Sequence, residues 1–316
     1  MTEHETAPTA PTAPPTEITG TTLVTGATGT TGGRIVRRLV SLGRPVTAAS
    51  RGAAAPAGAR GARFDWYDPA THGDALRGAD RLYVVPPVSD PDPAPVVLPF
   101  LRRARAAGVR RVVLLSSSAV RAGDPGVGQV HAALGDLFDT WTVLRPSWFM
   151  QNFTGHHPHA DSVRGDGVLT TATGTGRVGF VDADDIAAVA VHALTDDPPP
   201  TGDLVITGPE ALSYDEVAAL LSRVTGRPVR HTPVGFADLR DRLAAELPVA
   251  YAAFLAGLDR AIAEGAEDRV TDTVPRVTGR PPRTLREHAL AHLVQRPTRV
   301  TRPDHTPRPF AAAVRA

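Results

Sequence analysis

The chain has 316 residues, which is enough for one large α/β domain or for a main domain with a smaller cap, and its 42% hydrophobic and 21% charged residues are typical of a globular protein. Its 34 basic and 33 acidic residues give a net charge of +1, which does not favour nucleic acid or a membrane surface as a partner. The sequence contains neither cysteine nor lysine, which excludes disulfides, thiol catalysis and Schiff-base chemistry.

The two ends of the chain lack the pattern of folded elements. Residues 1–18 are rich in Thr, Ala and Pro without periodicity, and we expect them to be disordered. They also lack the basic start and apolar centre of a signal peptide. Residues 297–316 mix proline with arginine and predict a second loose tail. Since no apolar run approaches the roughly 18 residues of a membrane span, the interpretation is a cytoplasmic protein.

Short apolar runs alternate with helical patterns through the first half of the chain. Nearly continuous apolar runs such as "VVLL" suit a parallel sheet that is buried on both faces. Strand–helix alternation at this spacing predicts a doubly wound α/β fold of the Rossmann type. The expected strands are 21–26, 45–50, 62–64, 81–85, 111–118 and 141–146, and the expected helices are 32–42, 72–78, 94–107 and 127–138.

From about residue 206 the pattern changes to longer helical stretches with few strands, at 213–225, 236–263 and 284–295. This change predicts a dinucleotide-binding domain over 19–205 and a smaller, mainly helical, substrate-binding cap over 206–296. Nothing in the sequence sets the oligomeric state.

A glycine-rich turn joins the first strand to the first helix, with glycines at Gly26, Gly29 and Gly32. Glycines at such a position permit a tight backbone turn, close approach of the backbone to a pyrophosphate, and close packing of the helix on the strand. The N-terminus of the following helix offers N–H groups and a partial positive charge to phosphates. The position of the turn after the first apolar strand therefore predicts a dinucleotide site.

The end of the second expected strand indicates which dinucleotide binds. An NAD site usually has an acidic residue there for the ribose 2′-hydroxyl, whereas an NADP site offers arginine to the 2′-phosphate. This chain has Ser50 and Arg51, with no acid. The hypothesis is NADP(H); the alternative is that Arg51 is a solvated surface side chain.

Several motifs occur in the order of a known family: "TGATGTTG", "FDWYDPAT" at 64–71, "YVVPP" at 83–87, "VLRPSWFMQNF" at 143–153, "DDIAAVAVHAL" at 184–194 and "ITGPEALSYDEVAALLSRVTGRPV" at 206–229. On these motifs the chain resembles the NmrA-like atypical short-chain dehydrogenase/reductases. It is most similar to the ergot-alkaloid-type reductases that include the festuclavine dehydrogenase group.

The resemblance implies positions for the cofactor and for a substrate. Three groups of residues would contact the cofactor: Thr28, Thr30 and Thr31 along the diphosphate, Asp65 and Trp66 beside the adenine, and Val85, Pro86 and Pro87 along the ribose and nicotinamide. Ser116 to Ser118 and the turn at Arg145 and Pro146 would face the nicotinamide. Trp148, Phe149 and Phe153 are candidate walls of the substrate pocket, although core packing is an equal alternative for both phenylalanines.

The usual catalytic pair of short-chain dehydrogenases, Tyr-x-x-x-Lys, is absent because the chain has no lysine. His131 is the best substitute acid, since it lies on a helix in the region that usually supplies the pair. The alternative is a helix-surface histidine without a catalytic role. Ser117 is a candidate for orienting a substrate heteroatom, and Tyr251 is a further candidate proton donor.

Other polar clusters favour structural interpretations. The loop histidines His156, His157 and His159 lie beside Asp161, but no metal is expected there. Three acidic residues precede an apolar helix and are interpreted as capping groups: Asp182, Asp184 and Asp185.

The sequence thus predicts an NADPH-dependent reductase of a small organic substrate, with an imine or iminium as the preferred substrate class. A quinone or enone reductase is the first alternative on the same fold. A non-catalytic NADP(H)-binding redox sensor is the second, and a cyclase or isomerase without net redox change is the last.

Overall fold

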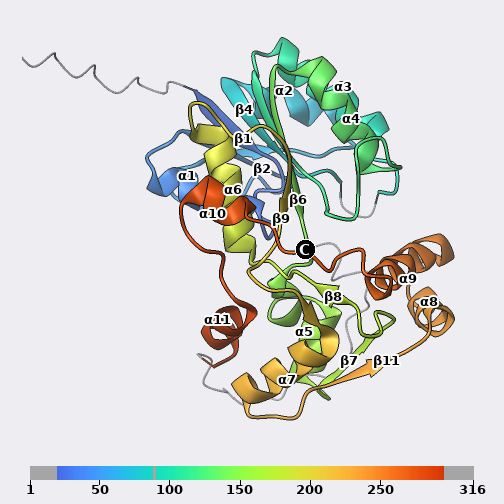
Figure 1. Cartoon of the computed structure of the whole chain (residues 1–316). Coiled ribbons are helices and arrows are strands. Elements are labelled where there is room, and N and C mark those ends of the chain that lie inside the picture. The colour runs from blue at the N-terminus through green and yellow to red at the C-terminus, as the bar shows by residue number, and fades with distance from the viewer. Residues whose placement is uncertain (1–19, 88–89, 295–316) are drawn as a thin grey trace, which may run out of the picture.

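The computed structural model describes residues 20–87 and 90–294, so both expected tails lie outside the described residues. A sheet of seven parallel strands in the order β3-β2-β1-β4-β5-β6-β9 forms its centre (Figure 1). The strand order reverses between β1 and β4, which is the switch point where ligands bind in doubly wound folds. The strands are β1 (Thr21–Val24), β2 (Val46–Ser50), β3 (Arg60–Arg63), β4 (Ala79–Val84), β5 (Arg111–Leu115), β6 (Thr140–Pro146) and β9 (Gly202–Ile206). The predicted fold class is confirmed.

Helices cover both faces of this sheet (Figure 1). Successive strand residues point to opposite faces, so Leu82 packs with α2, α3 and α4, whereas Tyr83 packs with α1, α6 and α10. This arrangement explains why the strands read as continuous apolar runs. The six helices are α1 (Gly32–Ser41), α2 (His72–Leu76), α3 (Ala94–Ala106), α4 (Val127–Leu137), α6 (Ala183–Thr195) and α10 (Thr273–Thr278), and a short η1 (Pro69–Thr71) precedes α2.

The cap below the sheet differs from the expected division, because it takes residues from both halves of the chain. Strand β7 pairs with β11 and β8 pairs with β10, so the segment after β6 belongs with the C-terminal part. Helix α10, which was expected in the cap, instead packs with the sheet domain, to which strand β9 belongs as expected. The cap elements are η2 (Met150–Phe153), α5 (Pro158–Arg164), β7 (Val168–Thr171), β8 (Arg177–Val178), β10 (Leu212–Ser213), α7 (Tyr214–Thr225), β11 (Arg230–Pro233), α8 (Phe236–Ala244), α9 (Val249–Ala263), α11 (Leu285–Ala289) and η3 (Leu290–Val294).

Local sequence signals explain several helix ends. The expected single helix 236–263 is two helices, and Pro248 directly precedes α9, where its missing N–H costs no helical hydrogen bond. The carboxylate of Asp182 accepts a hydrogen bond from the backbone N–H of Asp184, which caps α6 as the acidic run predicts. None of the described helices is long and apolar enough to cross a membrane.

Candidate active site

The glycine-rich turn lies at the carboxyl end of β1 and is closed by close backbone approach. Gly26 has φ +61°, a conformation that favours glycine, and its carbonyl accepts a hydrogen bond of 2.9 Å from the N–H of Gly29. A Cβ on Gly32 would lie 2.3 Å from the Gly26 carbonyl oxygen, so only glycine fits where α1 begins. The turn therefore has the tight geometry that the sequence pattern predicts.

The N-terminus of α1 is not capped by the side chain that precedes it. Thr31 is the N-cap residue, but its hydroxyl makes no hydrogen bond to the helix N–H groups. The hydroxyl oxygen instead accepts a hydrogen bond of 3.0 Å from the buried Tyr83 Oη. The Gly33 N–H donates a hydrogen bond of 3.0 Å to the Gly29 carbonyl within the turn, so the Thr31 side chain leaves the N-terminus of α1 open but not all of its N–H groups are free for an anionic ligand.

The end of β2 lies against this turn, because the Ala27 N–H donates a hydrogen bond of 3.1 Å to the Ala49 carbonyl. Ser50 is buried, and its hydroxyl accepts a hydrogen bond from the N–H of Ala54. Arg51 follows it, is exposed, and forms no ion pair with any described residue. An unpaired guanidinium thus stands beside the dinucleotide turn.

A hydrogen bond joins the segments that follow β3 and β4. The Trp66 indole N–H donates a hydrogen bond of 3.2 Å to the Val85 carbonyl, and the Val85 N–H donates one of 2.8 Å to Thr25 Oγ1. The Asp65 carboxylate accepts the N–H of Tyr67. The structure therefore places Trp66 against Val85, and Pro86 and Pro87 follow as partly exposed residues; the cofactor contacts of these residues stay predictions.

The ends of β5 and β6 are fixed by an arginine. Arg145 donates from Nε to the Ser117 carbonyl at 3.2 Å and from Nη2 to the Ser118 carbonyl at 2.8 Å, and it pairs with Asp203 at 2.7 Å. The Ser118 N–H bonds the Pro146 carbonyl. The hydroxyl oxygen of Ser116 is buried and has no partner among the described residues. These contacts set the serines and Pro146 side by side at the carboxyl edge.

Family models match most of the described chain: an NAD(P)H-binding model over residues 26–197 and the NmrA-like family over residues 130–285. The chain belongs to the NmrA-like family of NAD(P)H-binding oxidoreductases. The uncharacterized oxidoreductase YesF of Bacillus subtilis is 48% identical over 260 residues, which cover 82% of this chain and 90% of that protein.

Two further similarities indicate the branch of the family and support the fold. An agroclavine dehydrogenase of Claviceps fusiformis is 40% identical over 229 residues, covering 70% of this NmrA-like chain and 79% of the relative. The NADPH-dependent quinone oxidoreductase QOR2 of Escherichia coli, solved with NADPH, has a TM-score of 0.72 at 24% identity. That match covers 87% of this chain and 99% of the other. The resemblance to the ergot-alkaloid-type branch is thereby confirmed.

Within this NmrA-like fold, His131 lies in the interior between α4 and β6. It is 4% exposed, its ring packs 6.1 Å from that of Trp141, and Nδ1 has no partner among the described residues. Burial lowers its pKa. This position corrects the alternative of a helix-surface histidine, because the imidazole is buried, and the assignment of His131 as an acid stays a prediction.

Tyr251 and Ser117 are also not brought together. Tyr251 lies on α9, where its ring stacks on Phe254 and burial raises its pKa. The Ser117 hydroxyl accepts the N–H of Ala119 in its own turn. Neither side chain hydrogen-bonds the other or His131 within the described part of the chain.

The three aromatic residues after β6 have different surroundings. Trp148 and Phe149 are partly buried at the edge of two core clusters. Phe153 is 0% exposed, with its ring 5.2 Å from Phe180 and 6.0 Å from Tyr214. The core alternative therefore holds for Phe153, and its assignment as a pocket wall is corrected because no surface of it is accessible.

The loop histidines differ in their surroundings, since His156 is exposed whereas His157 and His159 are partly buried. Burial lowers the pKa of His157 to about 4 and that of His159 to about 3, so both are neutral at pH 7. No group of three or more His, Asp or Glu residues among the described ones is arranged to hold a metal ion.

Sequence reasoning missed Glu267, a carboxylate that is 3% exposed at the serine edge. Ser118 Oγ donates a hydrogen bond of 2.7 Å to it, and Arg269 pairs with it at 3.1 Å. The pattern "EGAED" reads as an exposed acidic loop, and 149 residues separate the two partners, so no local signal points to this contact. Glu267 ties the segment after α9 to the end of β5.

Proposed function

We propose that this NmrA-like oxidoreductase transfers hydride from NADPH to the carbon of an imine or iminium in a small organic substrate. The glycine turn and the N-terminus of α1 would hold the diphosphate. The end of β2 would select the phosphate on the ribose, and the edge of Ser116, Ser117 and Pro146 would face the nicotinamide.

The preference for NADPH rests on Arg51. It is exposed beside the turn without an ion-pair partner in the described chain, at the place where an NAD enzyme usually has an acid. A charge-assisted hydrogen bond to the 2′-phosphate contributes about 1.5–3 kcal/mol, or roughly 10- to 150-fold in affinity. Arg51→Ala is therefore expected to raise the Kd of NADPH within that range and to leave the Kd of NADH unchanged. Equal affinity of the wild type for both cofactors contradicts the preference.

The proposed substrate class rests on the absence of a suitable proton donor in the described chain, because the candidate side chains are buried or bonded to structural partners. The chain has no lysine, Tyr83 is buried and donates to Thr31, and His131 lies in the interior. Reduction of a ketone builds negative charge on oxygen and requires an acid or another stabilising donor. An iminium already carries positive charge and becomes a neutral amine when hydride arrives, so it requires no proton in that step.

Orientation of the cation against the nicotinamide would then supply much of the rate acceleration. Trp148 supports this proposal, because its indole is only partly buried and would bind a cation against its ring face. A relative named agroclavine dehydrogenase supports a small organic substrate. A quinone is the nearest rival, since its reduced anion is delocalised and also makes little demand on an acid.

The test is NADPH oxidation by the full chain with 1-pyrroline, menadione and cyclohexanone as acceptors. We expect turnover of 1-pyrroline that follows its protonated fraction, and only a small loss of kcat in His131→Ala. Turnover of menadione or cyclohexanone without 1-pyrroline contradicts the proposal, as does loss of kcat in His131→Ala with NADPH binding intact. Binding of NADPH without turnover of any acceptor favours the redox sensor instead.

A further inference from the structure

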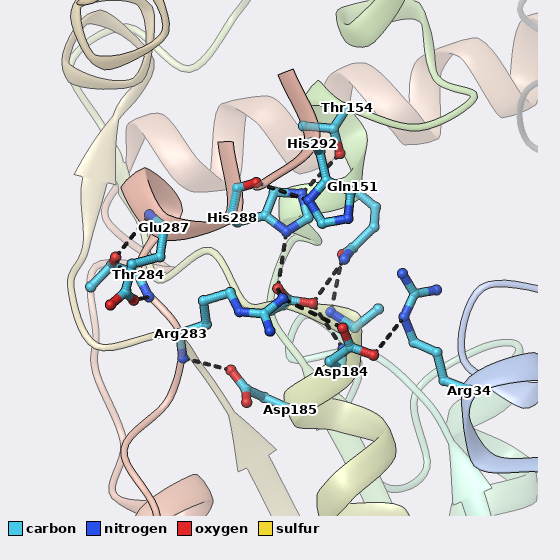
Figure 2. Close-up of polar contacts among 12 residues, drawn as sticks. Arg34, Gln151, Thr154, Asp184, Asp185, Arg283, Thr284, Glu287, His288 and His292 are labelled. Atoms are coloured by element: carbon cyan, nitrogen blue, oxygen red, sulfur yellow. Dashed lines mark hydrogen bonds and ion pairs between the residues drawn. The ribbon is translucent and has the colours of Figure 1, made fainter. Parts of the chain in front are cut away.

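Arg34 lies in the first turn of α1, directly after the glycine turn (Figure 2). Its Nη1 donates a hydrogen bond of 2.7 Å to the carbonyl of Thr30, a residue of the turn itself. Its Nε donates one of 3.0 Å to the carboxylate of Asp184 at the start of α6. One guanidinium thus joins the cofactor turn to the N-terminus of a second helix.

A cation at this place is unusual on electrostatic grounds. The N-terminus of a helix carries a partial positive charge, which disfavours arginine in the first turn. Asp184 offsets that repulsion, and α1 has no acidic residue in its own first turn. The arginine side chain is 20% exposed, so the ion pair is only partly screened by solvent.

Asp184 is itself held in a larger charged network (Figure 2). Arg283 contacts it at 3.4 Å and also pairs with Asp182 at 2.8 Å. Asp182 is 0% exposed and receives His288 Nδ1 at 2.9 Å. Burial alone raises the pKa of Asp182, but hydrogen bonds from His288, from the Asp184 N–H and from Gln151 outweigh it and lower the pKa. The anchor for Arg34 is therefore part of a network that is fixed from several sides.

We propose that Arg34 is a positioning residue of the dinucleotide turn, and that Asp184 acts on the cofactor through Arg34. By holding the Thr30 carbonyl, the guanidinium keeps the backbone before α1 oriented so that the helix N–H groups face the diphosphate. This inference rests on the proposed binding of NADPH at that turn. Its consequence is that a carboxylate on α6 strengthens the binding of an anionic cofactor.

The rival explanation is that Arg34 contacts the phosphates directly. The two explanations give opposite signs for Asp184→Asn. If Arg34 works by direct attraction, removal of a competing anion tightens NADPH binding. If Asp184 holds the arginine in place, the same change weakens binding.

The experiment is a fluorescence titration of the full chain with NADPH, for the wild type, Arg34→Met, Asp184→Asn and the double variant. Arg37→Met is the matched control, since Arg37 is exposed on the same helix and forms no ion pair with a described residue. We expect Kd to rise about tenfold in Arg34→Met, as for one lost charge-assisted hydrogen bond. Asp184→Asn should raise Kd less, and the double variant should be no weaker than Arg34→Met alone. At saturating NADPH, kcat should stay within about twofold of the wild type.

Several outcomes overturn the inference. Tighter binding by Asp184→Asn, additive effects in the double variant, or an equal loss in Arg37→Met each contradict positioning through Arg34. Thermal unfolding of every variant separates binding from stability, and Arg34→Lys, which keeps the charge without the forked donor, serves if Arg34→Met does not fold. Failure of the wild type to bind NADPH contradicts the proposed function and is distinguished by the first titration.

Discussion

Tyr83 Oη donates a hydrogen bond of 3.0 Å to Thr31 Oγ1, and both side chains are buried. The contact joins β4 to the residue before α1, across the switch point of the sheet. The same contact uses the phenol hydroxyl as a donor within the protein. Burial raises the pKa of Tyr83 well above its ordinary 10.0. Tyr83 is consequently a support of the turn and not a proton donor to a substrate.

Tyr83→Phe tests this assignment. The variant loses one buried hydrogen bond and leaves the Thr31 hydroxyl without its donor, which should lower the free energy of unfolding by about 1–2 kcal/mol. Turnover with NADPH should persist, because the phenol takes no part in the chemical step. Denaturant unfolding and steady-state kinetics measure the two effects. A fall in kcat of about 10²-fold or more, the contribution of a general acid, contradicts the assignment.

Gly32→Ala should abolish cofactor binding. Its Cβ would meet the Gly26 carbonyl oxygen at 2.3 Å and the carbonyl carbon at 2.8 Å, so the backbone of the turn must move. Gly257→Ala in α9 is the matched control, because nothing lies within 4 Å of its Cβ. That control should raise stability by about 0.5–1 kcal/mol. NADPH titration and thermal unfolding compare the two, and normal binding by Gly32→Ala contradicts the close approach.

The sheet domain was predictable because its signals are local. Strands buried on both faces read as apolar runs, and each helix between them shows an apolar face, as Ile35, Val36 and Leu39 do in α1. The cap was not predictable in the same way. Its strands β8 and β10 have two residues each and pair across 34 positions or more, so their partners leave no trace in either segment.

The candidate site likewise has parts that local sequence predicts and parts that it does not. The glycine turn is contiguous in sequence, and its geometry follows from steric requirements that only glycine meets. Glu267 at Ser118, and Asp184 at Arg34, are long-range pairs that only the fold brings together. The sequence placed His131 on the correct helix but did not show its burial, because the helical pattern of α4 did not reveal which face packs on β6.

Two aromatic variants separate the core from the site. Phe153→Ala removes a fully buried ring and should cost about 3–5 kcal/mol of stability. Trp148→Ala removes a partly exposed ring and should lower kcat/KM for 1-pyrroline more than it lowers stability. Thermal unfolding and kinetics at a temperature where both variants are folded provide the comparison. A loss of kcat/KM in folded Phe153→Ala larger than in Trp148→Ala contradicts the placement of Phe153 in the core.

The last prediction concerns Asp259 on α9, whose carboxylate accepts a hydrogen bond of 2.8 Å from the Ala172 N–H and pairs with no cation in the described chain. Burial raises its pKa from 3.8 to about 6, and that backbone hydrogen bond only partly opposes the effect. Because the folded pKa lies above the unfolded one, the neutral form favours the folded state. Stability from this group is fully present below about pH 4 and is lost as the pH rises through about 6.

Asp259→Asn keeps an oxygen for the Ala172 N–H and removes the charge, so it should be more stable than the wild type at pH 7.5, by at most about 3 kcal/mol. The difference between the two proteins should vanish near pH 4. His157 and His159, whose lowered pKa values also make stability depend on pH, contribute equally to both proteins and cancel in that difference. Denaturant unfolding from pH 4 to 8 measures the curve, with Asp241→Asn as control because its carboxylate is 66% exposed. If the difference in unfolding free energy between the two proteins does not change with pH, or has the opposite sign, the raised pKa of Asp259 is contradicted.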